Sequence, residues 1–508
     1  MSFLFLGEGC SVYLTLPLLH INSFVVEYSL MFDYTSVLFL SVVTWISANV
    51  FLFSMVYMQD DPRKNYFHNI LLLFVLSMML LISAASYFSL LVGWDMLGLT
   101  SFLLIVYYPS YEAKHSGVKT LMINRVGDVF LIMSFIYFSY TGSTLVVFTS
   151  SGAVLLYILA SMTKSAQWPF SSWLPAAMAA PTPVSSLVHS STLVTAGVFL
   201  LFRISENITS TSHSSMLIYV GSITMCVGGL SAFLEYDVKK TIAFSTMSQV
   251  GLMVVSVGLG APEVAMFHLF VHGVFKALLF LSAGNVLIMT GGNQDLRTMG
   301  GVGALCSVTS FSVTLSCLSL AGLPFISGYY SKHLVLMLFM SESVSIIAFV
   351  LFIMGLLFSI LYSVRLCYFL VWKKSSTVCL VGNLNWKLKV PLVLLSLSSI
   401  FFGWSLNALM WPLEVNVSLA SGQVLALALL PLFGVASALA ALSMNMHHSL
   451  EKMNSFRTLD ELYMSLVYYS SPVVSSAVLS DTYFFSHEWV KKSVVKLAKK
   501  LMNKSKWL

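Results

Sequence analysis

Long apolar segments recur along the chain of 508 residues, separated by short polar stretches. A helix needs about 20 mainly apolar residues to cross the core of a bilayer. The segments that predict such helices are Phe32–Tyr57, His68–Leu91, Gly93–Tyr108, Val118–Tyr140, Val154–Pro169, Val184–Phe202, Met216–Tyr236, Thr241–Leu259, Val264–Met289, Val308–Ser331, Val344–Val371, Val390–Met410 and Val424–Met446. Residues Phe3–Leu19 form a further candidate, which Glu8 and two glycines weaken.

The apolar segments are continuous, whereas the strands of a membrane barrel alternate apolar and polar residues over about ten positions. Backbone inside lipid must satisfy its own hydrogen bonds, so continuous segments of this length favour helices. The connections are too short to hold a separate soluble domain. We therefore predict an all-α fold, a polytopic transmembrane helix bundle.

The last residues of the chain have a different pattern. Val490, Val494, Leu497 and Leu501 recur at helical spacing, and lysines occupy the positions between them. This pattern predicts an amphipathic helix that lies along a membrane or protein surface. A charged tail without fixed structure is the alternative.

Composition supports a membrane protein and excludes several other classes. The chain is 58% hydrophobic and 9% charged, whereas soluble domains are about 25% charged. Seven lysines in the last eighteen residues account for the net charge of +6, so no basic face for nucleic acid remains. The six cysteines are scattered without metal-binding spacing, and no phosphate-binding loop is present. We expect no metal site and no cofactor site on this chain.

Several charged residues fall inside the apolar segments, where each costs about 2.5–3.5 kcal/mol even on a lenient insertion scale. Arg125 and Asp128 are three residues apart and can form an ion pair on one helix face. Lys164, Lys276 and Lys332 have no acidic residue three or four positions away. Their partners must come from other helices or from water, so each can be a structural cation or a site that binds and releases a proton.

His268, His272 and Lys276 are spaced four residues apart, which places them on one helical stripe about 12 Å long. Imidazoles titrate near neutral pH and can pass protons along water chains. His189 lies among Ser186, Ser190 and Ser191 in a similar apolar setting. A buried histidine can also be only a hydrogen-bond partner, so the stripe is the stronger signal.

Helix-breaking residues accompany two of the lysines. Breakers of this kind in two segments of a transporter point to an ion path between its halves, although they also occur as ordinary kinks. Those after Lys164 are Pro169, Pro175, Pro181 and Pro183, and those before Lys332 are Gly322, Pro324 and Gly328.

A set of motifs between about residues 28 and 370 resembles NADH–ubiquinone oxidoreductase chain 5. The motifs are Phe32-Asp33-Tyr34, Gly93-Trp94-Asp95, Asn124-Arg125-Val126-Gly127-Asp128, Lys164-Ser165-Ala166-Gln167, Trp173-Leu174-Pro175, the run from Pro181 to Gly197, Lys239-Lys240-Thr241, His272-Gly273-Val274-Phe275-Lys276, Asp295-Leu296-Arg297 and Gly328-Tyr329-Tyr330-Ser331-Lys332. The run from Pro181 to Gly197 is the most specific of them.

The resemblance implies an antiporter-like subunit of respiratory complex I in the mitochondrial inner membrane. Such a subunit moves protons while other subunits transfer electrons from NADH to ubiquinone and hold the flavin and iron–sulfur clusters. The expected organisation is N-terminal helices in 1–66, a proton-translocating core of two inverted five-helix repeats with broken helices in 67–372, further transmembrane helices in 373–479 and a shortened lateral helix in 480–508. The expected partners are other membrane subunits, especially the adjacent chain 4, accessory subunits and an anionic lipid such as cardiolipin.

The resemblance also implies roles for individual residues. Asp95 and Lys164 are expected to form an acid–base pair, Lys276 to be the central relay and Lys332 to lie on the exit side. The connecting histidines are His189, His268 and His272, and the supporting charges are Arg125, Asp128, Asp237 and Lys239.

Two positions depart from the family pattern, and two other interpretations remain open. The family usually has Glu at the position of Asp95 and an acid at the position of His333. A subunit of a multisubunit cation/proton antiporter would share the same core. A structural membrane spacer, in which the charges only pair with one another, would have similar composition.

Overall fold

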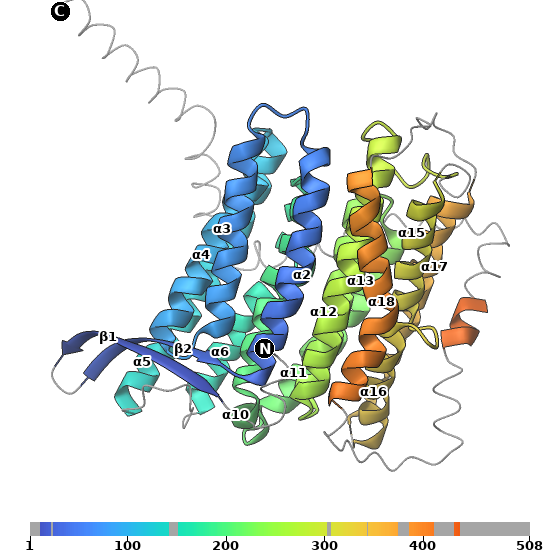
Figure 1. Ribbon diagram of the computed structural model, residues 1–508. Coiled ribbons are helices and arrows are strands. Elements are labelled where there is room, and N and C mark those ends of the chain that lie inside the picture. The colour runs from blue at the N-terminus through green and yellow to red at the C-terminus, as the bar shows by residue number, and fades with distance from the viewer. Residues whose placement is uncertain are drawn as a thin grey trace, which may run out of the picture. The chain divides into compact units, whose positions relative to one another are not determined.

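The computed structural model describes residues 11–21, 24–141, 151–301, 306–342, 344–373, 386–410 and 431–436 (Figure 1). Its α-helices are α2 Tyr34–Tyr57, α3 Lys64–Ser83, α4 Tyr87–Ile105, α5 Tyr111–Thr141, α6 Ser151–Lys164, α7 Trp173–Ala176, α8 Thr182–Leu187, α9 Leu193–Arg203, α10 Ser205–Thr209, α11 His213–Leu234, α12 Val238–Gly258, α13 Pro262–Met289, α15 Ser307–Ala321, α16 Ser327–Ser341, α17 Ile346–Cys367 and α18 Trp386–Met410. The short elements are the 3-10 helix η1 Ala177–Ala179 and the π-helices η2 Val188–Thr192 and η3 Tyr368–Trp372.

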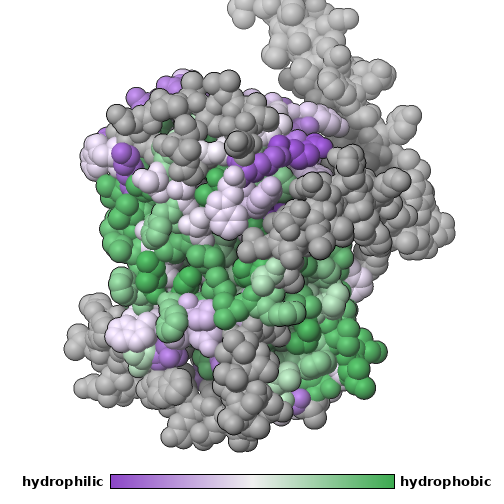
Figure 2. All heavy atoms as spheres, turned by 90° about the vertical axis from the view of Figure 1, so that its right-hand side faces the viewer, coloured by the Kyte–Doolittle hydropathy of each residue, from purple (hydrophilic) through white to green (hydrophobic). Residues whose placement is uncertain are grey.

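Within the described residues, ten helices are long and apolar enough to cross a membrane. Helices α6 and α15 are apolar but shorter. Hydrophobic residues form a broad belt on the face seen in Figure 2, and hydrophilic residues gather above it and in smaller numbers below it. The predicted all-α transmembrane bundle is confirmed.

Helix α13 is the centre of the bundle. It packs against α2, α8, α9, η2, α12, α15, α16 and α18. The apolar windows of α12 and α13 are completely buried, whereas only a third of the window in α5 is buried. Polar side chains on α13 are therefore shielded from lipid by a full layer of other helices.

The helix considered for Phe3–Leu19 is wrong over the described part of that segment. Strand β1 (Val12–Ile21) pairs antiparallel with β2 (Phe24–Phe32) in a two-stranded sheet. Pro17 lies inside β1, and proline in a helix interior removes a hydrogen bond and clashes with the preceding turn. The Ser86 hydroxyl donates to the Glu27 carbonyl over 2.8 Å, which attaches the hairpin to the start of α4.

Two predicted spans have different boundaries in the structure. The predicted segment His68–Leu91 is interrupted because α3 ends at Ser83 and α4 begins at Tyr87, with Ser86 as its N-cap. The predicted segment Val308–Ser331 consists of the end of one helix and the start of another, α15 and α16. Gly322 ends α15 in the left-handed conformation at φ 79°, which glycine adopts without steric cost.

Other predictions lie outside the described residues. The amphipathic helix of 480–508 and residues 3–10 are not described, and of the predicted span Val424–Met446 only 431–436 are described, as helix. The division of the chain at residues 66, 372 and 479 and the inverted relation of the two repeats stay predictions.

Gly328, at the start of α16, allows this helix to pack closely against the end of α15. A Cβ at this position would overlap the Ser319 carbonyl oxygen of α15. We expect Gly328→Ala to lower the stability of the purified chain by about 1–3 kcal/mol, the usual cost of overpacking. Thermal unfolding in detergent measures the effect. Gly152→Ala is the matched control, since a Cβ there meets nothing within 4 Å; equal melting temperatures for the two variants would contradict the prediction.

Candidate functional site

The intramembrane charges gather in three groups, each around one lysine. Lys164, at the end of α6, faces α4 and α5. Lys276, in the middle of α13, faces α12. Lys332, in α16, faces the end of α15 and helix α17. All three side chains are buried.

Lys164 is held against Trp94 rather than against a carboxylate. Its Nζ atom donates to the Trp94 carbonyl oxygen over 3.4 Å and lies 4.8 Å from the centroid of the indole ring. The indole Nε1 of Trp94 donates to Asp128 Oδ1 over 2.7 Å. Trp94 thus joins the lysine of α6 to a carboxylate of α5.

Asp95 points toward Arg125, as the ion-pair geometry shows. Its Oδ1 atom lies 3.7 Å from Arg125 Nη1, and the same guanidinium lies 3.1 Å from Asp128 Oδ2. The side chains of Asp95 and Arg125 are 46% and 48% exposed. Asp95 and Lys164 form no ion pair in the structure, although both Asp95 and Asp128 interact electrostatically with the lysine. The predicted pair is therefore a four-residue group with Arg125 at its outer side.

Lys276 is a buried cation without an acidic partner in the part of the chain that the structure describes. Its Nζ atom donates to Ser245 Oγ of α12 over 2.6 Å. Burial of an ammonium group is unfavourable unless it is paired or can lose its charge. A serine hydroxyl does not compensate the charge, so this site suits a lysine that changes protonation state.

The histidine stripe continues from Lys276 toward α16. The rings of His272 and His268 are 6.1 Å apart, and Nδ1 of His268 lies 2.8 Å from Ser331 Oγ. Both ring nitrogens of His272 are buried without a hydrogen-bond partner. Ser331 is the residue before Lys332, so the predicted stripe reaches the third lysine group.

Lys332 lies at the break between α15 and α16. Its Nζ atom donates to the Leu320 carbonyl oxygen and lies 3.5 Å from Ser359 Oγ of α17. Next to it is a cavity of about 30 Å³, lined by residues of α15, α16 and α17 and by Gly322 and Pro431. A cavity of this size has room for about two water molecules.

His189 lies in the other broken segment. Helices α8 and α9 are joined through the π-helix η2, and π-turns inside α-helices are common at functional sites. Both ring nitrogens of His189 are buried without a partner, and its ring centroid is 6.2 Å from that of Trp173. Trp173 Nε1 donates to the carbonyl oxygen of Thr163, the residue before Lys164, and η2 packs on α13. His189 therefore lies between the Lys164 group and the central stripe.

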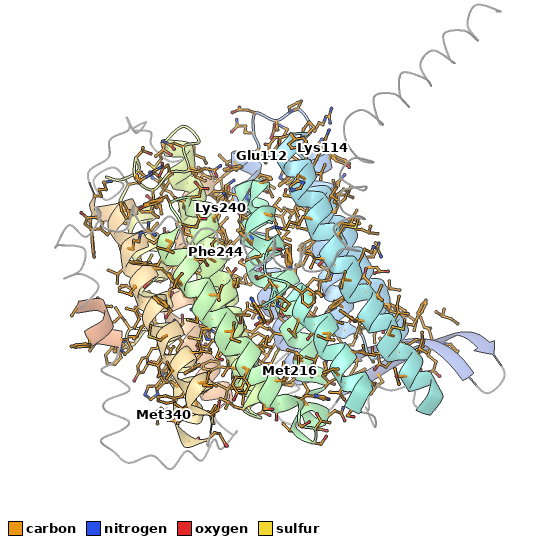
Figure 3. The ribbon with its side chains drawn as sticks, turned by 180° about the vertical axis from the view of Figure 1, so that it is seen from behind. Glu112, Lys114, Met216, Lys240, Phe244 and Met340 are labelled. Atoms are coloured by element: carbon orange, nitrogen blue, oxygen red, sulfur yellow. The ribbon has the colours of Figure 1, made fainter. Side chains whose placement is uncertain are left out.

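The supporting residues Asp237 and Lys239 lie at the start of α12, away from the central stripe. Asp237 Oδ2 pairs with Lys240 Nζ at 2.9 Å. Figure 3 places Lys240 toward the end of the bundle that carries Glu112 and Lys114, opposite Met216 and Met340. Lys239 is buried and donates to the Ala180 carbonyl oxygen over 3.1 Å, immediately before α8. Lys239 therefore stabilises the entry to the broken helix.

Sequence reasoning missed the neutral residues that hold the charged groups. Trp94 was noted only within a motif, and no signal marked Ser245, Ser331 or Ser359 among the many serines of the apolar segments. Each of these contacts depends on how two helices cross, which spacing along one helix does not show. Within the described residues, no three His, Cys, Asp or Glu side chains gather so that they could hold a metal ion.

Two family models match the chain. One, described as NADH:quinone oxidoreductase/Mrp antiporter, TM, covers residues 84–359. The other, described as NADH-Ubiquinone oxidoreductase (complex I), chain 5 N-terminus, covers residues 18–68. The first match contains the charged residues of all three lysine groups and the three histidines between them.

Whole-chain comparisons agree with these matches. NADH-ubiquinone oxidoreductase chain 5 of Anopheles gambiae is 38% identical over 422 residues, which cover 81% of this chain and 73% of that protein. The protein of the same name from Mytilus edulis is 37% identical over 448 residues, covering 85% and 78%. The structure of the Mrp complex from Dietzia sp. DQ12-45-1b contains a chain with a TM-score of 0.78 and 23% identity, covering 99% of this chain and 59% of that one. At that identity the last likeness shows the fold only.

Proposed function

The chain belongs to the NADH–ubiquinone oxidoreductase chain 5 family, and from this premise we propose that its buried lysine and histidine axis carries the protons. It is a proton-translocating membrane subunit of respiratory complex I. The redox energy that drives translocation comes from electron transfer between NADH and ubiquinone. We assign that electron transfer, with its flavin and iron–sulfur clusters, to other subunits.

The observation that carries the proposal is the environment of Lys276. This lysine lies on the completely buried helix α13, donates to a serine and has His272 one turn away on the same stripe. A permanently charged lysine in the middle of a completely buried helix is costly unless a carboxylate offsets its desolvation. A cation that loses its proton to a neighbouring group, with water or imidazole as carrier, needs none.

The proposed path follows the order of the groups in the fold. A proton bound at Lys164 passes the layer of His189, reaches Lys276 and continues through His272 and His268 toward Ser331 and Lys332. The proposal requires bridging water across gaps such as the 6.1 Å between the two histidine rings. The cavity beside Lys332 has room for water only at the end of the path. Asp95, Arg125 and Asp128 set the local charge at the first lysine.

The surroundings of the chain follow from the same proposal. We place it as a multi-pass subunit of the mitochondrial inner membrane, next to the antiporter-like chain 4 and accessory subunits. Anionic lipid such as cardiolipin is the proposed contact of the lysine-rich segment 491–506.

Proton uptake into sealed vesicles that contain the assembled complex tests the function. NADH oxidation should acidify the vesicle interior when the NADH site faces outward, and the rate should be the same with sodium or potassium as the only monovalent cation. The fold likeness to the Mrp complex makes a cation/proton antiporter subunit the second candidate. Transport that depends on sodium and not on NADH would favour that candidate.

Asp95→Asn is expected to lower the pumping rate without preventing assembly. Arg125 keeps its contact with Asp128 at 3.1 Å, so the substitution leaves no unpaired guanidinium. Because Asp95 is half exposed, we expect a decrease of about two- to fivefold, the scale of an exposed ion pair. The rate per assembled complex is the measurement, and Glu112→Gln at the exposed start of α5 is the control. Normal pumping by assembled Asp95→Asn would show that this carboxylate has no role.

A further inference from the structure

Tyr362 joins helices α17 and α12 inside the bundle. Its side chain is buried, its hydroxyl accepts from Gln249 Nε2 over 3.1 Å, and Ser248 Oγ lies 3.1 Å from the same oxygen. The Ser248 hydroxyl donates to the Ser245 carbonyl oxygen over 2.9 Å. Tyr362 therefore donates to Ser248 and accepts from Gln249, so both functions of its hydroxyl are used on α12.

The segment of α12 that Tyr362 holds also carries the acceptor for Lys276. Ser245 lies one turn before Ser248 and accepts from Lys276 Nζ over 2.6 Å. Ser248 and Gln249, the two residues that hydrogen-bond to the Tyr362 hydroxyl, follow Ser245 within about one turn of α12. The tyrosine hydroxyl is thus part of the buried cluster around the central lysine.

The face of α17 that carries Tyr362 also contacts the Lys332 group. Ser359 lies three residues before Tyr362, and residues at this spacing are neighbours on a helix surface. Its hydroxyl oxygen is 3.5 Å from Lys332 Nζ. One face of α17 therefore contacts both the Lys332 group and the helix that binds Lys276. The Lys276 and Lys332 groups are thus connected in two ways, through His268 and Ser331 and through α12, Tyr362 and Ser359.

We propose that Tyr362 is a positioning residue that couples the geometry of the Lys276 and Lys332 groups. The inference rests on the proposed function, in which protons pass between these two lysines. By fixing α12 to α17, the hydroxyl keeps Ser245 in hydrogen-bond distance of Lys276 while Ser359 stays beside Lys332. Tyr362 acts through these serines and does not itself carry the proton.

Tyr362→Phe tests the proposal because it keeps the ring and removes only the hydroxyl. We expect kcat for NADH-driven proton pumping, per assembled complex, to fall about fivefold, which is on the scale of the one or two hydrogen bonds that the substitution removes. KM for NADH and for ubiquinone should not change, because both bind on other subunits. Ser363→Ala is the matched control on the same helix, since that buried hydroxyl donates to Ile360 of its own helix, and it should pump normally. A structural role would lower the amount of complex and leave kcat unchanged.

Gln249→Leu removes the hydrogen bond between α12 and Tyr362 from the α12 side. It tests the proposal even if the Tyr362→Phe complex does not accumulate. Gln249→Leu removes one of the two hydrogen bonds of the Tyr362 hydroxyl, so its loss of kcat should be no larger than that of Tyr362→Phe. The double variant should be no worse than Tyr362→Phe alone, because neighbours in one network are not additive. Normal kcat in Gln249→Leu and in any assembled Tyr362→Phe, or additive losses in the double variant, would overturn the proposal. Lys276→Met in the same assay separates the two ideas. If it pumps normally, the proposed function fails; if it does not pump while Tyr362→Phe does, only the role of Tyr362 is wrong.

Discussion

Replacing Lys276 with methionine is expected to stop proton translocation while the chain remains folded and inserted. The lysine has no acidic partner within the described residues, so its removal leaves no unpaired carboxylate. Its acceptor Ser245 keeps a hydrogen bond to the Ile242 carbonyl oxygen over 2.7 Å. Removing a buried charge also removes its desolvation cost, so the folded state should not become less stable.

The expected loss of pumping is roughly 100-fold, which is within the range for removal of a proton-transferring group. The measurement is NADH-driven proton uptake per assembled complex in sealed vesicles, with NADH oxidation by artificial acceptors as a check that the redox subunits are intact. Lys114→Met is the control, because that lysine lies exposed at the start of α5, away from the axis (Figure 3). A pumping rate near that of the control would show that Lys276 is not on the proton path.

The length of the apolar segments predicted the helix bundle well, because a helix that crosses the bilayer core must be apolar over about 20 residues. It failed where an apolar segment was not a helix. The residues of β1 are apolar but mostly exposed in the structure, and a short apolar segment does not distinguish strand from helix by composition. Pro17, together with the β-branched and aromatic residues around it, was the available signal for a strand.

The breakers around Lys332 predict a broken helix, and the structure has a break at this point; only the boundaries of the predicted span are wrong. Gly322 and Pro324 were assigned to the interior of one span, whereas they end α15 and let α16 begin at Ser327. Proline restricts the residue before it to extended conformations, which favours a helix boundary at this point. Lys332 therefore lies inside a second helix, and its ammonium group reaches back to a carbonyl at the end of the first.

In the candidate site, spacing along one helix predicts which residues share a face of that helix, but it does not predict contacts between helices. The stripe of His268, His272 and Lys276 follows from spacing on one helix, and the structure places all three on the buried helix α13 as a continuous row. The relation of Asp95 to Lys164 depends instead on how α4, α5 and α6 cross. Those crossings bring Arg125 to Asp95 and Trp94 to Lys164, which no periodicity within a helix specifies.

Replacing Lys332 with arginine is expected to separate a fixed cation from a proton carrier. Arginine keeps the positive charge and can donate to the Leu320 carbonyl oxygen and to Ser359, as the lysine does. The cavity of about 30 Å³ beside Lys332 gives the larger side chain room. The guanidinium group does not lose its proton in proteins, whereas a buried lysine can.

If Lys332 only holds the broken helix together, Lys332→Arg should assemble and pump at close to the normal rate. If it binds and releases protons, the complex should assemble but pump roughly 100-fold more slowly. We expect the second result. Lys332→Gln completes the test, because it keeps a hydrogen-bond donor for Leu320 but removes the charge, and it should also assemble and fail to pump. Pumping at the normal rate in the arginine variant would assign Lys332 a purely structural role and end the proton path before α16.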